Sequence, residues 1–172
     1  GIFGMETEKI GFIETGVMGA SIVKHLLTAG HEVTIYTRTK SKAATLVEAG
    51  AKWADTPAAA TTGQHVVFTM VGYPQDVEEV YGGSNGIFSA AQPGTIVVDM
   101  TTSEPTLAKK LFDQASERGI HSLDAPVSGG DIGAQNGTLS LMIGGDKAVF
   151  EQMQPIFEVF GQNIVYQGVA GS

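Results

Sequence analysis

A glycine-containing turn near the start of the chain has the composition of a phosphate-binding loop. Residues 14–19 read Glu-Thr-Gly-Val-Met-Gly and follow the short apolar run 10–13, which predicts a buried strand. Gly16 lacks a Cβ, so the main chain there can approach a pyrophosphate closely, and Gly19 allows the next helix to pack tightly on the strand. That helix, expected over 17–29, offers unpaired N–H groups and the positive end of its dipole. The turn therefore indicates a pyrophosphate site, although such a turn can also be purely structural.

Glu14 departs from the Gly-x-Gly-x-x-Gly pattern that is typical of such turns. It stands at the first glycine position, where a carboxylate about 5 Å from a phosphate charge opposes binding by roughly 3 kcal/mol at an effective dielectric of about 20. Two alternatives follow: either the Glu14 side chain turns away from the phosphate, or Glu14 weakens cofactor binding.

The end of the second expected strand, 32–36, is followed by cations and hydroxyls. NAD-binding units place an acidic residue there, which holds the ribose hydroxyls. Here Arg38 is followed by Thr39, Ser41 and Lys42, whose groups suit a 2′-phosphate. The alternative is a solvated basic helix start, although cations at that end oppose the helix dipole. The cluster predicts NADP (as NADPH) rather than NAD as the cofactor.

The stretch 124–130, Asp-Ala-Pro-Val-Ser-Gly-Gly, is the second candidate site. Ser128 supplies a hydroxyl, and Gly129 and Gly130 allow backbone N–H groups to face a small anion such as a carboxylate. The alternative is a glycine loop that only turns the chain.

Other side chains that could do chemistry are interpreted as structural or solvated. The histidines have no spacing that suggests a shared partner; they are His25, His31, His65 and His121. Lys109 and Lys110 lie on an early turn of an expected helix and should be solvated. We assign no metal site.

Strands and helices alternate along the chain, which predicts an α/β fold of the Rossmann type with a doubly wound, mostly parallel sheet. Further strands are expected at 51–54, 65–71, 95–99, 120–124, 138–144 and 163–166. Further helices are expected near 42–48, 57–63, 74–80, 105–118 and 146–154.

Two segments between these elements carry weaker signals. We expect 125–137 to be a long glycine-rich loop and Pro155 to break or kink the last helix. The strand ends at Glu14, Thr37, 70–72 and 100–101 should lie along one edge of the sheet, where such folds bind ligands.

The composition limits the class of protein. The chain has 172 residues, which suits one domain, and 42% apolar residues, which excludes a disordered chain. A net charge of −8 argues against nucleic acid or anionic lipid as a partner. There is no cysteine and no apolar run of membrane-spanning length, so we expect no disulfide and a cytoplasmic location. Residues 1–4 are interpreted as a cloning remnant and 5–172 as one dinucleotide-binding domain.

Five motifs occur in register between Lys9 and Ser172. They are Gly-Phe-Ile-x-x-Gly-x-Met-Gly (11–19), Tyr-x-Arg-Thr (36–39), Asp-Met-x-x-x-x-Pro (99–105), Asp-Ala-Pro-Val-Ser-Gly-Gly (124–130) and Gly-Ala-x-x-Gly-Thr-Leu (133–139). With these motifs the chain resembles the β-hydroxyacid dehydrogenase family, which includes 3-hydroxyisobutyrate dehydrogenases and the glyoxylate/succinic semialdehyde and tartronate semialdehyde reductases.

The resemblance implies a role for each matched residue. Pyrophosphate binding is implied for Ile13, Glu14, Thr15, Gly16, Val17, Met18 and Gly19. Contacts with the 2′-phosphate are implied for Arg38, Thr39 and Lys42, and contacts with the adenosine and nicotinamide ribose for Met70, Val71 and Thr101. A substrate carboxylate would be held by Ser128, Gly129 and Gly130.

The resemblance also implies that part of the active site lies outside this chain. The family's catalytic lysine, in a Gly-x-Gly-x-x-x-Lys segment, is expected a few residues beyond Ser172, so no catalytic residue is assigned here. The family's helical second domain, which forms much of the dimer interface, is expected to follow. We therefore expect an NADP(H)-dependent oxidoreductase of small hydroxyacids or semialdehydes, homo-oligomeric at full length, and an inactive fragment.

Other interpretations stay open. A non-catalytic dinucleotide-binding module is one, and Glu14 slightly favours it. An NADP-binding domain like that of 6-phosphogluconate dehydrogenases is another. The imine reductases share the first motif, but the Ser128–Gly130 loop disfavours them.

Overall fold

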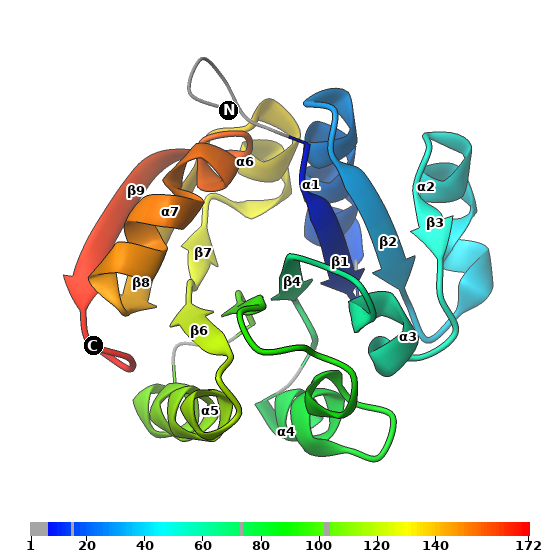
Figure 1. Ribbon diagram of the computed structural model, residues 1–172. Helices are drawn as coiled ribbons and strands as arrows, with labels where there is room; N and C mark the ends of the chain where they lie inside the picture. Colours follow the sequence, from blue (N-terminus) through cyan, green and yellow to red (C-terminus); the bar gives the residue numbers. More distant parts are fainter. Residues whose placement is uncertain (1–6, 15, 73, 102–103) are drawn as a thin grey trace.

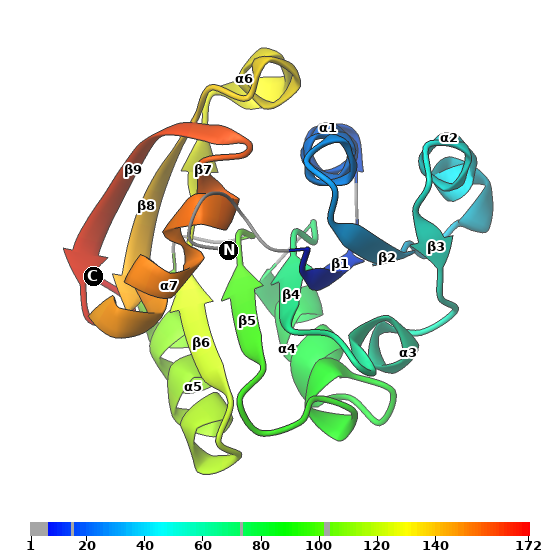
Figure 2. The ribbon, with the colours of Figure 1, turned by 45° about the horizontal axis from the view of Figure 1, so that its top comes forward.

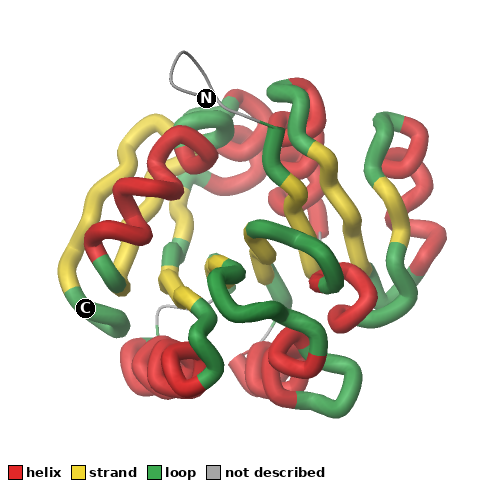
Figure 3. Tube along the Cα trace, viewed as in Figure 1, coloured by secondary structure: helices red, strands yellow, loops and turns green. Residues whose placement is uncertain are grey.

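The structure is a computed structural model that describes residues 7–14, 16–72, 74–101 and 104–172. Strands and helices alternate along the chain (Figures 1 and 3). The strands are β1 (Lys9–Ile13), β2 (Glu32–Tyr36), β3 (Lys52–Trp53), β4 (Val66–Thr69), β5 (Ile96–Asp99), β6 (His121–Asp124), β7 (Val127–Ser128), β8 (Leu139–Gly145) and β9 (Gly161–Gly168). The α-helices are α1 (Gly16–Thr28), α2 (Ala44–Glu48), α3 (Pro57–Thr61), α4 (Pro74–Gly82), α5 (Pro105–Glu117), α6 (Gly130–Asn136) and α7 (Lys147–Phe157). Two short 3₁₀ helices are η1 (Lys40–Ala43) and η2 (Ile87–Ser89).

These strands form one sheet with the order β3-β2-β1-β4-β5-β6-β8-β7, and β9 pairs with β8. The first six strands of this order are mutually parallel, which is the Rossmann arrangement. β8 runs antiparallel to β6 and β7, whereas β9 is parallel to β8. The predicted α/β fold with a mostly parallel sheet is therefore confirmed.

Helices cover both faces of the sheet (Figure 2). α1, α2 and α7 lie on one face, and α3, α4 and α5 lie on the other. β1 and β4 are buried between these layers, which explains their nearly continuous apolar sequences. Phe12 and Phe68 stack across the two strands with ring centroids 5.8 Å apart, and Phe160 meets Phe68 edge-on at 6.0 Å. The centre of the sheet is thus held by packed rings.

Gly11 in β1 is required by the close approach of α3. A Cβ built at Gly11 would lie 2.4 Å from the carbonyl oxygen of Ala60. Thr56 begins α3 by accepting a 3.0 Å hydrogen bond from the N–H of Ala59, and Pro57 occupies the first turn. The helix therefore packs directly on the backbone of β1.

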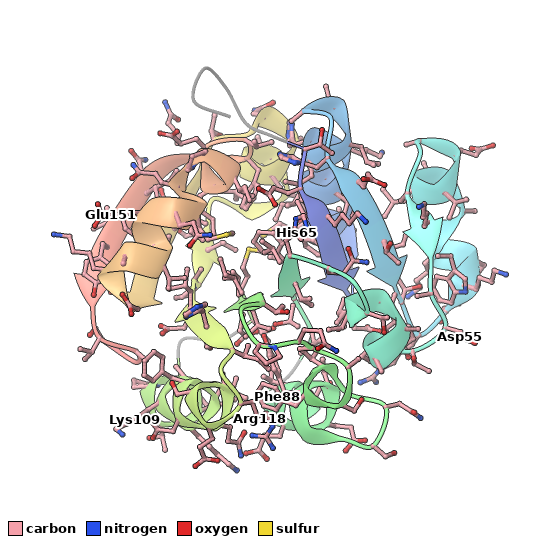
Figure 4. All side chains as sticks on the ribbon, viewed as in Figure 1. Asp55, His65, Phe88, Lys109, Arg118 and Glu151 are labelled. Carbon is pink, nitrogen blue, oxygen red and sulfur yellow. The ribbon has the colours of Figure 1, made fainter. Side chains whose placement is uncertain are left out.

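A cation–π contact also helps to hold the elements on this side of the sheet together. The Arg118 guanidinium, just after α5, lies 4.7 Å from the centre of the Phe88 ring in η2 (Figure 4). This contact joins two connections that lie at the amino ends of β5 and β6.

The segment 125–137 is not the simple loop that we expected. It contains the short strand β7 and the helix α6. α6 is stabilised from outside, because the His25 imidazole on α1 bonds to the carbonyl oxygen of Ala134 at 2.8 Å and to that of Gln135 at 3.0 Å. Gly137 then ends α6 in a left-handed conformation, with φ of 68°.

Pro155 lies inside α7 and does not end it, so the expected break at this residue was wrong. Proline removes one backbone donor, but Met153, Ile156 and Phe157 are buried around it, at 1%, 5% and 0% exposure. The apolar contacts made by the last turn outweigh the lost hydrogen bond. None of the helices among the described residues is long and apolar enough to cross a membrane.

Candidate cofactor-binding site

The carboxyl ends of the central strands meet at one edge of the sheet, as predicted. The N–H of Glu14 donates to the carbonyl oxygen of Tyr36 at 2.7 Å, which joins the ends of β1 and β2. The N–H of Met70 donates to Ile13 at 3.1 Å, and the N–H of Met100 donates to Thr69 at 2.8 Å. These bonds continue the sheet beyond the strand ends. They lie on both sides of the position between β1 and β4 where the strand order reverses direction, which is called the switch point.

A cleft of about 520 Å³ lies over this edge. It is lined by Glu14 and 16–19 after β1, by 70–72 after β4, by Met100 and Thr101 after β5, and by Val127 in β7. Most of the residues predicted to contact a dinucleotide are thus brought together. Gly72, Met100 and Val127 were given no role in cofactor binding, although 70–72 and 100–101 were expected at this edge and Val127 belongs to the motif 124–130.

Ile13, which was predicted to bind pyrophosphate, is fully buried in the core beneath the cleft and does not line it. Thr15 lies outside the described residues.

The turn after β1 presents an open main chain to the cleft. Gly16 begins α1 with a φ of 37°, and a Cβ built there would meet nothing within 4 Å. Gly19 is buried against the sheet, and no acidic residue occupies the first turn of α1. The N–H groups and the dipole at the start of this helix therefore face space in which a phosphate group fits.

Glu14 adopts an unusual backbone conformation at the rim of the cleft. Its φ of 63° is the one positive value for a non-glycine residue among the described residues. Its Oε1 accepts a 2.9 Å hydrogen bond from the N–H of Arg38 and lies 3.9 Å from the Arg38 Nε. The side chain is therefore directed toward the end of β2.

The basic cluster after β2 is exposed to solvent. Arg38, Thr39 and Lys42 all lie at the surface, and η1 begins at Lys40. Thr39 is fixed by its carbonyl oxygen, which accepts from the Thr37 hydroxyl at 2.8 Å and from the N–H of Lys42 at 3.0 Å. These three residues stand beside the cleft rather than within its lining.

The Arg38 guanidinium has a second acidic neighbour. Its Nη2 lies 3.3 Å from Oδ1 of Asp76, in the first turn of α4, and the Arg38 side chain is 61% exposed. Exposed ion pairs contribute little to stability, so another anion can replace Asp76 at low cost. Asp76 was not identified from the sequence.

A buried carboxylate supports the floor of the cleft. Asp99, 3% exposed, accepts from the Thr69 hydroxyl at 2.8 Å and from the N–H of Thr101 at 3.1 Å. The Thr101 hydroxyl oxygen in turn accepts from the N–H of Val71 at 2.9 Å, and the Tyr81 hydroxyl lies 2.9 Å from the Thr69 hydroxyl. Burial raises the pKa of Asp99, partly offset by the hydrogen bonds from Thr101 and Thr69.

The predicted anion loop borders the same edge. Ser128 ends β7 and is exposed, and Gly129 and Gly130 have φ values of 127° and 65° that favour glycine. Val127, which precedes this loop, lines the cleft, so the loop lies next to the cleft. Among the described residues, no other contact points to a ligand at this loop.

Three of the four histidines take part in structural contacts. His25 joins α1 to α6, as described above. The Nδ1 of His31 accepts from the N–H of Glu8 at 3.0 Å, and the Nδ1 of His65 lies 2.7 Å from a carboxylate oxygen of Glu8. Within the described part of the chain, no group of three or more histidine, aspartate or glutamate residues is arranged to hold a metal ion.

The lysines of α5 form exposed ion pairs. Lys109 lies 3.2 Å from Asp113, and Lys110 lies 2.9 Å from Glu78. Both are solvated, as predicted.

The strand order, the switch-point cleft and the open helix start define a Rossmann-type dinucleotide-binding domain. The model of the NAD-binding domain of 6-phosphogluconate dehydrogenase matches residues 9–168. The chain belongs to the β-hydroxyacid dehydrogenase family and contains the NAD-binding domain of that family.

Individual relatives agree with this assignment. The uncharacterized oxidoreductase YkwC of Bacillus subtilis is 57% identical over 163 residues, covering 95% of this chain and 57% of that protein. The structure of Mycobacterium tuberculosis 3-hydroxyisobutyrate dehydrogenase with L-serine superimposes with a TM-score of 0.91 at 31% identity, covering 96% of this chain and 56% of that one. The structure of Psf3 in complex with NADP+ and 2-OPP gives a TM-score of 0.90 at 32% identity, covering 95% and 58%. The chain thus spans somewhat more than half the length of these relatives.

Proposed function

We propose that the chain is the cofactor-binding part of an NADP(H)-dependent dehydrogenase or reductase that acts on small hydroxyacids or semialdehydes. The observation that carries the proposal is the juxtaposition of the cleft and the basic cluster. The start of α1 offers amides to a pyrophosphate, and Arg38, Thr39 and Lys42 stand beside it at the end of β2. The complex of Psf3 with NADP+, at 32% identity, supports the same cofactor.

We propose a role for each segment from its place in the fold. Gly16 and its neighbours would bind the pyrophosphate, while Met70 and Val71 would contact the adenosine side. Thr101 would contact the nicotinamide ribose, and Asp99 holds its N–H in place. When bound, the reduced nicotinamide supplies the hydride that a carbonyl carbon accepts.

Substrate binding is proposed for Ser128, Gly129 and Gly130. A hydroxyl and glycine amides suit the carboxylate of a hydroxyacid, and the loop borders the cleft through Val127. The similar structure from Mycobacterium tuberculosis is one with L-serine, which carries both a hydroxyl and a carboxylate.

The proton that completes the reduction is proposed to come from a lysine that follows Ser172 in the full protein. In this proposal the lysine follows a residue near the carboxyl end of β6, because the N–H of Gly171 donates to Asp124 Oδ1 at 3.2 Å there. A residue shortly after Gly171 would therefore enter at the cleft edge, where an ammonium can stabilise a developing alkoxide. We further propose that the full protein is a cytoplasmic homo-oligomer.

Titration with NADPH and NADH tests the cofactor proposal. We expect NADPH to bind more tightly than NADH, with a micromolar dissociation constant. The variant Arg38→Ala should weaken NADPH binding by about tenfold or more and change NADH binding little, because a charge-assisted bond contributes about 1.5–3 kcal/mol. Lys52→Ala, which removes an exposed cation elsewhere, is the matched control. Equal weakening of both cofactors by Arg38→Ala would contradict the assignment of the 2′-phosphate.

A non-catalytic dinucleotide-binding module is the second candidate, and Glu14 at the first glycine position is the observation that favours it. Turnover separates the two candidates. The full-length protein should reduce small semialdehydes with NADPH if it is an enzyme. Binding of NADPH without turnover across a panel of such substrates would support the module instead.

A further inference from the structure

We propose that Glu14 is a specificity-determining residue, which opposes the 2′-phosphate of NADP(H) and accepts the ribose hydroxyls of NAD(H). The preference for NADP(H) that Arg38, Thr39 and Lys42 provide is therefore reduced by this chain's own carboxylate. This inference rests on the proposed function, because it needs a dinucleotide in the cleft.

The position of the Glu14 side chain is the first argument. Glu14 follows β1, yet its N–H bonds to Tyr36 at 2.7 Å and its carboxylate accepts from the N–H of Arg38 at 2.9 Å. Both partners belong to the end of β2 and the residues just after it. NAD-binding domains place an acidic side chain at the end of β2 to hold the ribose hydroxyls. In this chain a carboxylate reaches the same place from β1.

The remaining bonding capacity of that carboxylate is the second argument. A carboxylate has about four lone-pair sites, and the N–H of Arg38 occupies one of them. The Glu14 side chain is 22% exposed and borders the cleft, so it is open to a ligand. Hydroxyl groups of a ribose can donate to the free sites, whereas a phosphate has only acceptors and negative charge to offer.

The surroundings of Arg38 are the third argument. Its guanidinium lies between two carboxylates, with Nε 3.9 Å from Glu14 and Nη2 3.3 Å from Asp76. A 2′-phosphate must share or replace these partners before it gains the full attraction of Arg38. NAD(H) has no such group and avoids this competition.

The backbone of Glu14 is the fourth argument. A φ of 63° is readily adopted by glycine and disfavoured for glutamate, so the residue is held in a strained conformation at the rim of the cleft. A glycine would fit this turn without strain. The shape of the turn therefore does not require a glutamate, and the feature that the glutamate adds there is its carboxylate.

Binding measurements on Glu14→Gln test the proposal. This variant keeps the size of the side chain and an oxygen acceptor for Arg38, and it removes only the charge. We expect the dissociation constant for NADPH to fall by about tenfold or more, that for NADH to stay the same or rise, and the ratio of the two to change by at least tenfold. Glu32→Gln, at the opposite end of β2 and exposed, removes the same charge and should leave the ratio unchanged.

The alternatives give different results. If Glu14→Gln tightens both cofactors equally, Glu14 only repels the shared pyrophosphate, and the proposal is overturned. If neither cofactor binds the parent chain or any variant, the proposed function itself fails. If the glutamine variant folds poorly, Glu14→Gly is the second variant. It removes the carboxylate and relieves the backbone strain, and it should also lower the dissociation constant for NADPH relative to that for NADH.

Discussion

The hydroxyl of Thr69 donates a 2.8 Å hydrogen bond to the carboxylate of Asp99, which joins the carboxyl ends of β4 and β5 beneath the cleft. Asp99 also receives the N–H of Thr101, so one buried carboxylate holds two of the segments that line the cleft. The floor of the candidate site is thus fixed by a side chain that does not line the cleft.

Replacement of Asp99 by alanine should lower the free energy of unfolding by about 3 kcal/mol. The Thr69 hydroxyl and the Thr101 N–H would lose their shared acceptor, and each buried unsatisfied group costs about 1–3 kcal/mol. Urea unfolding followed by circular dichroism measures the change. Asp113→Ala, which removes an exposed carboxylate on α5, should shift the same quantity by less than about 0.5 kcal/mol. A loss below about 1 kcal/mol for Asp99→Ala would contradict the role of Asp99.

The pH dependence of stability should reflect the buried state of Asp99. Burial raises its pKa in the folded protein above the ordinary value of 3.8, so the folded state binds the proton more tightly than the unfolded state. Its contribution to stability is therefore greatest below about pH 3.8 and decreases as the pH rises toward the raised folded value. Asp124 contributes with the same sign, because burial raises its pKa too.

Asp99→Asn isolates this effect, because its side chain does not titrate. The free energy of unfolding of the parent chain minus that of Asp99→Asn should fall as the pH rises from about 4 to 7. Groups that do not interact with Asp99 cancel in this difference, and Asp124 does not cancel fully because its charge interacts with Asp99. A difference that grew with pH would show instead that the folded state stabilises the ionised form.

Gly11→Ala should destabilise the domain by about 1–3 kcal/mol. The new methyl group would lie 2.4 Å from the carbonyl oxygen of Ala60, and backbone on both sides must move to admit it. Gly82→Ala is the matched control, because a Cβ there meets nothing within 4 Å at the end of α4. Thermal unfolding should show a lower midpoint for the first variant and an unchanged or slightly higher one for the second. Similar midpoints for the two variants would disprove the close approach of α3 and β1.

His25→Ala should loosen α6 without unfolding the domain. The imidazole Nε2 donates to the carbonyl oxygens of Ala134 and Gln135, and its loss removes a contact between α1 and a short, glycine-containing helix. Amide hydrogen exchange within 130–136 should become faster while exchange in β1 and β4 stays slow. His121→Ala, at an exposed position in β6, should leave exchange in 130–136 unchanged. Unchanged exchange in His25→Ala would mean that α6 is held by other contacts.

Much of the fold could be predicted from the sequence, since local patterns and tertiary packing agree along most of the chain. The buried runs in β1 and β4 and the glycines of the first turn indicated the start of the Rossmann order. The second half was predicted less well. α6 has only seven residues, two of them glycine, and depends on His25, which lies far away in the sequence.

The candidate site shows the same division. Residues in continuous motifs, such as Gly16 and Thr101, lie in the lining of the cleft, and their contact with a cofactor stays a prediction. The Glu14–Arg38 hydrogen bond and the Asp76 contact join residues from different segments, and sequence spacing does not indicate which way a long side chain turns. At Pro155 the local sequence was misleading. Proline is a strong signal for a helix end, but the burial of its neighbours in α7 outweighs that signal.

The imidazole bridge between α1 and α6 has a kinetic consequence. α1 starts at the turn after β1, and α6 starts in the loop that follows β7. If the proposed nucleotide binds at the start of the first helix, it would also restrict the second, and less entropy would be lost when the proposed acid binds afterwards. Such a linkage favours ordered binding, in which the nucleotide binds before the acid.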